Sequence, residues 1–347
     1  MTSDRPAEGE GLTVTVLKSF RAFCAIEAEW RELFAAAVHP TTFLRHRWLR
    51  LSWELRWRRF PNRLRVILIR QHGRLMMAGA FVLGMRRLKP KFEFLASGTP
   101  QYHDVLWRPS DSTSRQAELL LDTLLSETVL QAKIATRYLR DVSPLRAAVQ
   151  ARGLEQRVRH QWPSPYVALR EHRDFEGYLA TLSPRLRYDH RRRLRRFAEI
   201  GVGYAHETGT AAREVVQWCF ERKRDWLDRT NQKSEWLSSG YVDRFFATFL
   251  EGESDVPDTW VASLRSAGQV FAASIVFIER DAAFFSKIAH DPAFNRHSPG
   301  RTLTLLLIES AFQRGLAEFD LGVGTLEWKQ RLQPTMRTST IESIRLK

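Results

Sequence analysis

The chain has 347 residues, of which 44% are hydrophobic, enough to build the cores of two ordinary domains and to exclude a disordered chain. The 54 lysines and arginines outnumber the 39 aspartates and glutamates, so the formal net charge is +15. Such a charge attracts nucleic acid, anionic lipid and phosphorylated cofactors alike, and therefore does not identify a partner.

The N-terminal segment and the two cysteines indicate where the protein works. Cys24 and Cys219 are far apart in the sequence and predict neither a disulfide framework nor a cysteine metal site. Residues 1–11 are polar, lack the apolar stretch of a signal peptide, and are expected to form a disordered tail. Every apolar run is too short or too interrupted to span a bilayer. We therefore expect a cytoplasmic protein without a metal or a transmembrane segment.

The first half, residues 12–160, is expected to follow the order β-α-α-β-β-β-α-β. A strand at Thr13–Leu17 precedes a helix that Ser19 caps and whose apolar positions recur at helical spacing as far as Phe34. The remaining elements are predicted at residues 44–57 (helix), 64–70, 75–85 and 92–96 (strands), 114–129 (helix) and 134–141 (strand).

The second half, residues 161–347, repeats much of this order. Its elements are predicted at 166–169 (strand), near Phe175 and after Pro184 (helices), at 202–250 (an additional strand and helices), and at 260–265, 269–278 and 282–289 (strands). Val66–Arg70 also aligns with Val261–Arg265 at a constant offset of 195 residues, as do the glycine and alanine that follow each run. Matched element order favours an internal duplication, although matches this short also arise by chance.

The segment 269–329 carries the most informative pattern. Two β-rich runs separated by residues 279–281 predict a hairpin. Ser298 then caps a helix with Pro299 in its first turn, and Gly315 ends it. A third strand, 317–321, follows. A helix N-terminus directly after a strand pair presents free backbone N–H groups and a positive dipole, so this turn is expected to bind an anion.

An arginine-rich helix precedes these strands. Seven arginines and one aspartate occupy residues 185–196, while Leu186, Leu194 and Phe197 share one face at helical spacing. The outer surface is either a solvated face or a phosphate-binding one, in which Arg187, Arg191 and Arg192 make the bidentate contacts that arginine favours.

Strand, strand, Ser-Pro-Gly turn, helix and strand in succession resemble the GNAT superfamily of acyltransferases. More closely, the chain resembles the CelD/BcsL-like acyltransferases associated with bacterial cellulose and exopolysaccharide production. The resemblance is carried by Ser183–Arg187, Arg191–Arg196, Gly268, Ala272–Ala273, His290–Asp291, Ser298–Gly300, Phe319–Gly322 and Trp328–Lys329, and by a Trp-rich N-terminal part. It implies two tandem α/β (α+β) GNAT-like domains, each a mixed, mostly antiparallel sheet flanked by helices.

The resemblance also implies a donor site for acetyl-CoA or another acyl-CoA in the second domain. Two parallel strands would separate around the pantetheine, and the following helix N-terminus would hold the pyrophosphate. The residues implied are Ile288, Ala289, Arg296, Ser298, Gly300, Arg301 and Thr302. The phosphate loop departs from the family pattern, and so does Trp328, which stands where the family often has tyrosine.

Direct attack on a thioester requires a group that takes a proton and donors that stabilise the oxyanion. By position, His290, Asp291, Asp320 and Lys329 are the candidates. Asp320 lies in an apolar strand and is expected to pair with Lys329 or an arginine, in a role that is either structural or catalytic. The first domain lacks the Ser-Pro-Gly turn, so it is expected to shape the acceptor cleft through His103 and Asp104, unless these lie in a polar loop. Arg187, Arg191 and Trp328 complete the acceptor set.

Three functions follow from these patterns. The first is an acyl-CoA-dependent N- or O-acyltransferase, expected to be an acetyltransferase, that acts on a sugar or polysaccharide precursor. The second keeps the tandem fold but takes aminoacyl-tRNA as donor, as the Fem-type aminoacyltransferases do, because of the net charge and the arginine helix. The third is a non-catalytic adaptor on a degenerate transferase fold. Nucleic acid is not favoured as a partner, and peripheral membrane association stays open.

Overall fold

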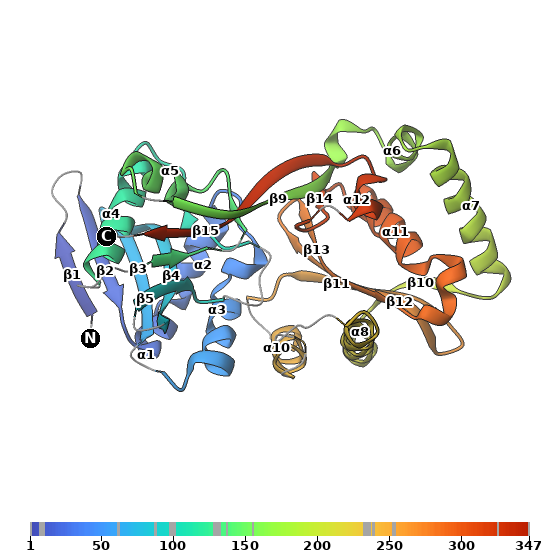
Figure 1. Ribbon diagram of the computed structural model, residues 1–347, viewed down its shortest axis with the longest axis horizontal. Helices are drawn as coiled ribbons and strands as arrows, with labels where there is room; N and C mark the ends of the chain where they lie inside the picture. The colour runs from blue at the N-terminus through green and yellow to red at the C-terminus, as the bar shows by residue number, and fades with distance from the viewer. Residues whose placement is uncertain are drawn as a thin grey trace. The chain divides into compact units, whose positions relative to one another are not determined.

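The computed structural model describes residues 2–6, 11–60, 63–86, 89–96, 102–127, 133–136, 138–154, 156–231, 237, 240–251, 255–324 and 326–345. The chain forms two compact units, which are coloured along the sequence in Figure 1. Unit 1 comprises Met1–Trp162, Glu253–Asp255 and Thr338–Lys347, and unit 2 comprises Pro163–Gly252 and Val256–Arg337.

The sheet of unit 1 is antiparallel through β2 and three following strands, and then gains a parallel strand. Its order is β1 (Thr2–Pro6), β2 (Leu12–Leu17), β3 (Leu64–Gln71), β4 (Arg74–Arg86), β5 (Lys89–Phe94), β7 (Lys133–Ala135) and β15 (Thr335–Arg345), with β6 (Leu106–Trp107) beside β4 and β8 (Leu139–Arg140) beside β15. The pairing of β1 with β2 corrects the expected disordered tail, because the backbone of Thr2–Pro6 extends the sheet edge. Residues 1 and 7–10 of that tail lie outside the described residues.

The helices of unit 1 are α1 (Phe20–Ala25), α2 (Glu27–Ala36), α3 (His46–Ser52), α4 (Thr113–Ser126) and α5 (Pro144–Ala151), with short helical segments at Thr42–Leu44 and Trp53–Trp57. Ser19 caps α1 as predicted, because its side chain accepts a hydrogen bond from the Ala22 N–H. The predicted helix through Phe34 is divided in two at Ile26. Residues 128–129, the predicted end of α4, are outside the described part.

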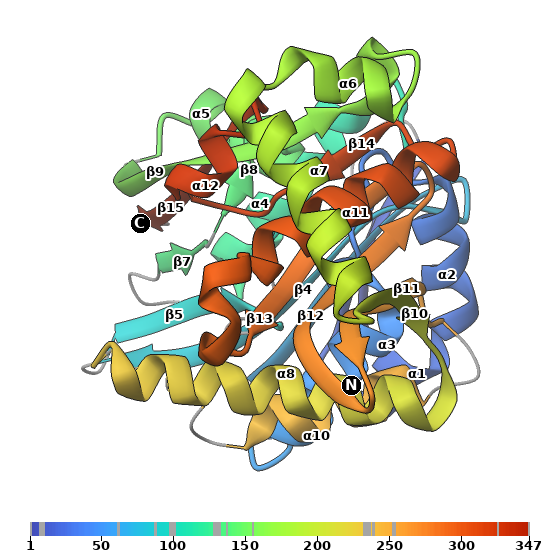
Figure 2. The ribbon, with the colours of Figure 1, turned by 90° about the vertical axis from the view of Figure 1, so that its right-hand side faces the viewer.

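The sheet of unit 2 lies between two groups of helices, as Figures 1 and 2 show. Its strand order is β9 (Gln156–Ala168), β14 (Glu318–Asp320), β13 (Ala282–His290), β12 (Gln269–Glu279), β11 (Asp258–Ser266) and β10 (Gly203–Glu207). One face is covered by α6 (Phe175–Thr181), α7 (Pro184–Glu199) and α11 (Pro299–Gln313), and the other by α8 (Gly209–Arg229) and α10 (Tyr241–Leu250). Shorter segments are Leu169–Glu171, Pro292–His297 and α12 (Glu327–Gln330).

The two sheets share topology and register. In each, a helix connects the fourth antiparallel strand to a parallel neighbour: α4 leads from β5 to β7, and α11 from β13 to β14. A β-bulge interrupts the β3–β4 hairpin between Ile69 and Arg70, and another interrupts the β11–β12 hairpin between Leu264 and Arg265. The two bulges are separated by the same offset of 195 residues that aligns the sequences. Since a bulge is a specific local irregularity, this agreement supports an internal duplication.

The C-terminal strand differs from the expected division at residue 161. Residues 338–347 belong to unit 1, because β15 pairs antiparallel with β7 and β8. The local sequence does not specify this partner, because strand register depends on the residues opposite. No helix in the described ranges is long and apolar enough to cross a membrane.

Candidate functional site

The parallel strands β13 and β14 separate after a short ladder. They pair at Ala282 with Glu318, at Ala283 with Phe319 and at Phe284 with Asp320. Strand β14 then ends, whereas β13 continues to His290 along β12. The separation predicted from the sequence is therefore present. Beyond Phe284, β13 pairs with β12 on one edge and no longer runs beside β14 on the other.

A bulge in β13 sets which side chains face which helices. Ile275 pairs with Lys287 and Val276 pairs with Phe285, so Ser286 is the additional residue. Before the bulge, Phe285 packs in the core with Phe319 and Trp328. After it, Ile288 and His290 return to the same face.

The N-terminus of α11 lies against the end of β13. A Cβ atom added to Gly300 would be 3.4 Å from Nδ1 of His290 and 3.7 Å from Cδ1 of Ile288. Pro299 begins the helix as predicted, but Ser298 makes no side-chain cap because its backbone is left-handed (φ 48°). Its carbonyl instead accepts hydrogen bonds from the N–H and hydroxyl of Thr302.

The predicted cofactor residues differ in how close they lie to the junction of β13 and α11. Ile288 and Gly300 lie together where β13 ends and α11 begins, and the first N–H groups of that helix lack intrahelical acceptors. Ala289 is the next residue of β13 and is buried. Arg301 adds positive charge, and its proximity contributes to the lowered pKa of Arg193 on α7, which burial mainly causes. Arg296 is exposed and its Nε donates to His297. The buried Thr302 uses its hydroxyl within the turn.

His290 and Asp291 stand at the same turn. Nε2 of His290 lies 2.9 Å from Oδ1 of Asn295, and loss of hydration lowers the pKa of His290. Asp291 accepts a hydrogen bond from the Ala293 N–H and so begins the helical turn 292–297. Asp291 therefore has a local structural role, and His290 lies beside the N-terminus of α11.

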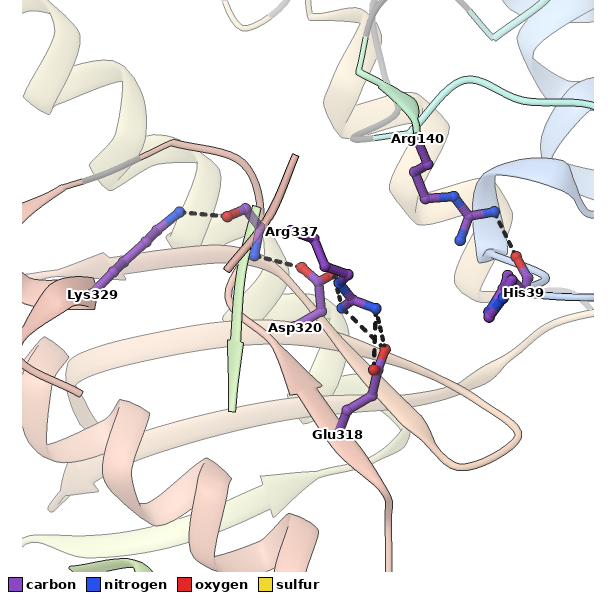
Figure 3. Close-up of polar contacts among 7 residues, drawn as sticks. His39, Arg140, Glu318, Asp320, Lys329 and Arg337 are labelled. Carbon is purple, nitrogen blue, oxygen red and sulfur yellow. Dashed lines mark hydrogen bonds and ion pairs between the residues drawn. The ribbon is translucent and has the colours of Figure 1, made fainter. Parts of the chain in front are cut away.

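Asp320 is held by an arginine rather than by Lys329 (Figure 3). Its side chain is 3% exposed, and its Oδ2 accepts from Arg337 at 3.1 Å while its Oδ1 accepts from the Gly322 N–H at 2.6 Å. Arg337 also contacts both carboxylate oxygens of Glu318 and stacks 3.9 Å above the ring of Tyr166. One arginine therefore ties β14 to β9, the strand paired with it on the side away from the separation.

Lys329 holds the turn that follows β14. Its Nζ donates to the carbonyls of Gly322 and Val323 at 2.9 and 3.0 Å. Burial lowers the pKa of Lys329 to about 8, against a smaller opposing effect of Asp320. The neighbouring Trp328 packs on Phe285 at a ring separation of 5.9 Å. Lys329 and Trp328 thus shape the end of β14.

The lowered pKa of Lys329 predicts a specific pH dependence of stability. Between pH 8 and the ordinary value of 10.5 the unfolded chain binds the proton that the folded chain has released, so this lysine makes folding more favourable as pH rises. Urea unfolding of wild type and Lys329→Met should therefore show wild type gaining stability relative to the variant across that window. A difference between the two proteins that is constant with pH would contradict the buried, titrating amine.

Arg187 and Arg191 lie apart from this site, in a groove between α6 and α7. The groove has a volume of about 350 Å³ and is lined by Glu176, Ala180, Pro184, Arg187, Tyr188, Arg191 and Arg195. Arg187 donates to the carbonyl of Ala180, and Arg191 pairs with Glu176 at 2.9 Å. The predicted packed face is present, because Leu186 and Phe197 are buried.

His103 and Asp104 are buried in unit 1 rather than exposed. They are 2% and 1% exposed, and His103 packs on Phe94. Asp104 accepts hydrogen bonds from Ser143 and the Val105 N–H, and burial raises the pKa of Asp104 in spite of Arg140. Arg140 also donates to the carbonyl of His39 (Figure 3). Both side chains are thus buried in a loop of unit 1, and their role toward an acceptor stays a proposal.

Sequence reasoning missed Arg337, Glu318 and Lys287. Glu318 and Asp320 alternate in β14, which was a signal that two carboxylates share one face and require a cation. Arg337 lies 17 residues beyond Asp320, so no local pattern identifies it as the partner. Lys287 was the charged residue within a predicted apolar strand.

Comparisons with known proteins agree with this geometry. Residues 184–330 match a family model described as an acetyltransferase (GNAT) domain. Similar solved structures are FemX (11% identity, 92% of this chain and 95% of that chain, TM-score 0.67), a conserved protein of unknown function from Bacteroides thetaiotaomicron (12%, 92% and 97%, 0.58) and the C-terminal domain of a putative lysylphosphatidylglycerol synthetase from Agrobacterium fabrum (11%, 93% and 92%, 0.56).

At such identities the structural similarity concerns the fold alone. Comparison with curated proteins found no match. The family match covers the separated strands and the α11 turn, and so confirms the predicted tandem GNAT-like α/β fold together with the duplicated topology. The chain carries a GNAT acetyltransferase domain and is an acyltransferase.

Proposed function

We propose that the protein transfers an acyl group, most simply acetyl, from acyl-CoA to an amine or hydroxyl of a saccharide or polysaccharide precursor. The observation that carries the proposal is the separation of β13 from β14 beyond Phe284, with the α11 N-terminus over the end of β13. An extended amide chain such as pantetheine can pair with the edge of a strand in that gap.

Each part of the site has a task in this reaction. The N–H groups of Gly300 and Arg301 and the dipole of α11 bind the pyrophosphate. His290 lies beside that end of the donor, at the tip of β13. The acyl group then lies toward the start of the separation, near Phe284 and Asp320. The Arg337 contacts keep β14 in place there, so that the donor is held between fixed strands.

The saccharide acceptor rests on the resemblance to CelD/BcsL-like acyltransferases. Attack by an amine or hydroxyl on the thioester carbon forms the new C–N or C–O bond, and the C–S bond breaks. A group on the protein must take the acceptor's proton. Arg187, Arg191 and Trp328 remain proposed acceptor residues, and peripheral membrane association and a cytoplasmic location remain expectations.

Mass spectrometry of small molecules retained by the purified protein tests the proposal directly. We expect CoA or an acyl-CoA, whose mass also gives the acyl length. In parallel, CoA added at 100 times its Kd should stabilise the fold by about 2.7 kcal/mol, measured as a rise in Tm. Absence of both a retained CoA species and a Tm shift would overturn the proposal.

A second candidate, an aminoacyl-tRNA-dependent transferase, is favoured by one observation. Arg187, Arg191 and Arg195 line the same side of the α6–α7 groove at successive helical turns, next to Tyr188, which is 61% exposed. Arginines with an exposed aromatic side chain suit a phosphate backbone with unstacked bases.

Replacing these three arginines by glutamine tests that candidate. If tRNA binds there, the slope of log K against log salt should become less steep by about two to three, following the number of phosphate contacts removed. Filter binding of tRNA at several salt concentrations provides the measurement, with Arg170→Gln, an exposed arginine of unit 2, as control. Unchanged binding and slope would leave the acyl-CoA donor as the remaining proposal.

A further inference from the structure

Lys287 is directed toward α8 by the bulge in β13. In a regular strand Lys287 would share the face of Phe285, which packs in the α11-side core. Because Ser286 is the additional residue, Ile288 and His290 lie on that face instead of Lys287. Both are next to Gly300 of α11. Lys287 and its cross-strand partner Ile275 therefore face the other side of the sheet, where α8 packs.

The surroundings of Lys287 on this face are cationic and partly apolar. Among the described residues, Lys223 and Cys219 of α8 act electrostatically on its amine, and its Nζ donates to the carbonyl of Ser286 at 3.0 Å. Cys219 is fully buried, 4.0 Å from the carbonyl of Ala273. Lys223 also contacts the ring of Trp226 at 5.5 Å.

The acidic groups across the separation are already engaged. By the register of β14 with β13, Glu318 and Asp320 alternate with the core residue Phe319, so they face the same side as Lys287. Both carboxylates contact Arg337. On the opposite face, the pKa of His290 responds to Lys223 and Arg229. The amine of Lys287 is thus influenced mainly by burial and by another lysine.

Burial and the charge of Lys223 lower the pKa of Lys287 to about 8, and burial likewise lowers the pKa of Lys223. Both effects disfavour the ammonium form. A substantial fraction of Lys287 is then a neutral amine near pH 7 to 8, where a proton acceptor works best. The same residue follows the point at which β13 leaves β14, where the proposed donor presents its acyl group.

We propose that Lys287 is the general base that takes the acceptor's proton during acyl transfer. This inference rests on the proposed function. The neutral Nζ accepts a proton as the acceptor's amine or hydroxyl forms its bond to the carbonyl carbon of the thioester. The C–S bond then breaks with its electron pair on sulfur, and the Lys287 ammonium returns the proton to give the free thiol of CoA. Atoms and charge balance without another reactant.

Trace labelling with acetic anhydride measures the reactivity of the Lys287 amine and requires no acceptor substrate. The extent of labelling of the peptide that contains Lys287, followed by mass spectrometry from pH 6 to 11, should have its midpoint near pH 8. Saturating CoA should reduce this labelling at least fivefold and leave the partly exposed Lys18 of unit 1, which pairs with Glu127, as an unchanged reference. Labelling that CoA does not affect, in a protein whose Tm CoA raises, would overturn the assignment and leave the proposed function intact.

Three variants then test whether Lys287 acts as a base or has only a structural role. Acetyl-CoA and glucosamine serve as probe substrates. Lys287→Met should lower kcat/KM by about 10² to 10⁴, without changing the Tm shift given by CoA. Lys287→Arg keeps the charge but cannot act as a base near neutral pH, and should be equally impaired. Lys223→Gln removes the like charge, so the pH midpoint of labelling and of any rate should move upward.

The outcomes distinguish a failure of the proposed function from a failure of the base assignment to Lys287. If wild type neither binds CoA nor gains stability from it, the proposed function fails and the assignment of Lys287 fails with it. If CoA binds and Lys287→Arg retains the wild-type pH profile, or Lys223→Gln leaves the labelling midpoint unchanged, only the base assignment is wrong. Labelling and the CoA-induced Tm shift decide between these cases even when glucosamine is not the acceptor.

Discussion

Asp320→Ala should lower the free energy of unfolding by about 3 kcal/mol. The substitution leaves Arg337 without one carboxylate and the Gly322 N–H without its acceptor, both next to the buried end of β14. Arg337 is partly exposed and keeps Glu318, so the loss should stay at the low end of the range for a broken buried pair. Urea unfolding at pH 7, monitored by circular dichroism, measures the change.

Two further variants test the origin of this effect. Asp320→Asn retains an acceptor for Gly322 but not the charge, and should cost less than alanine. Asp281→Ala removes an exposed aspartate of unit 2 that pairs with Arg170, and should cost no more than about 1 kcal/mol. Equal losses for Asp320→Ala and Asp281→Ala would show that the Arg337 contacts contribute little to stability.

Gly300→Val should weaken CoA binding by about 10- to 100-fold, equivalent to roughly 1.4 to 2.7 kcal/mol, while leaving the fold stable. A Cβ at this position would be at ordinary van der Waals distance from His290 and Ile288, so the helix can accept a side chain. The branched methyl groups of valine would then occupy space beside the end of β13 and the first N–H groups of α11, where the pyrophosphate is proposed to lie. Isothermal titration with CoA measures the affinity.

Matched glycine variants provide the controls for this measurement. Gly300→Ala should have a smaller effect than valine, because it adds one carbon. Gly177→Val places the same side chain in the first turn of α6, where a Cβ would lie 3.3 Å from Oδ1 of Asp174, and should leave CoA affinity unchanged. If Gly300→Val binds CoA like wild type, the α11 turn does not hold the pyrophosphate.

Local pattern explains which elements were predictable. Apolar runs at 269–278 and 282–289 became β12 and β13, and the turn between them includes Arg280 with a positive φ of 56°. Pro299 begins α11 and Gly315 follows its end, as the preferences of proline and glycine require. The predicted cap by Ser298 failed, because its left-handed backbone (φ 48°) leaves the side chain without a cap hydrogen bond.

The sequence predicted that the residues proposed for the donor lie close together, but not which partners the proposed acid–base residues have. Ile288 and Gly300 were named from strand and turn patterns, and the structure brings them into contact. Asp291 and Asp320 were chosen for their chemistry and position, yet the structure uses one as a cap and the other in an ion pair with Arg337. Lys287 was not among the predicted residues, and regular alternation would have placed it on the face of Phe285.

The sequence by itself determined the order of strands and helices, the repeat at an offset of 195 residues, and the start of α11, because periodicity, turn residues and proline act over a few positions. Tertiary structure decided that β15 completes the sheet of unit 1, that Arg337 pairs with Asp320, and that the bulge at Ser286 directs Lys287 toward α8. These outcomes depend on strand register and on partners distant in the sequence, which only the packed sheets specify.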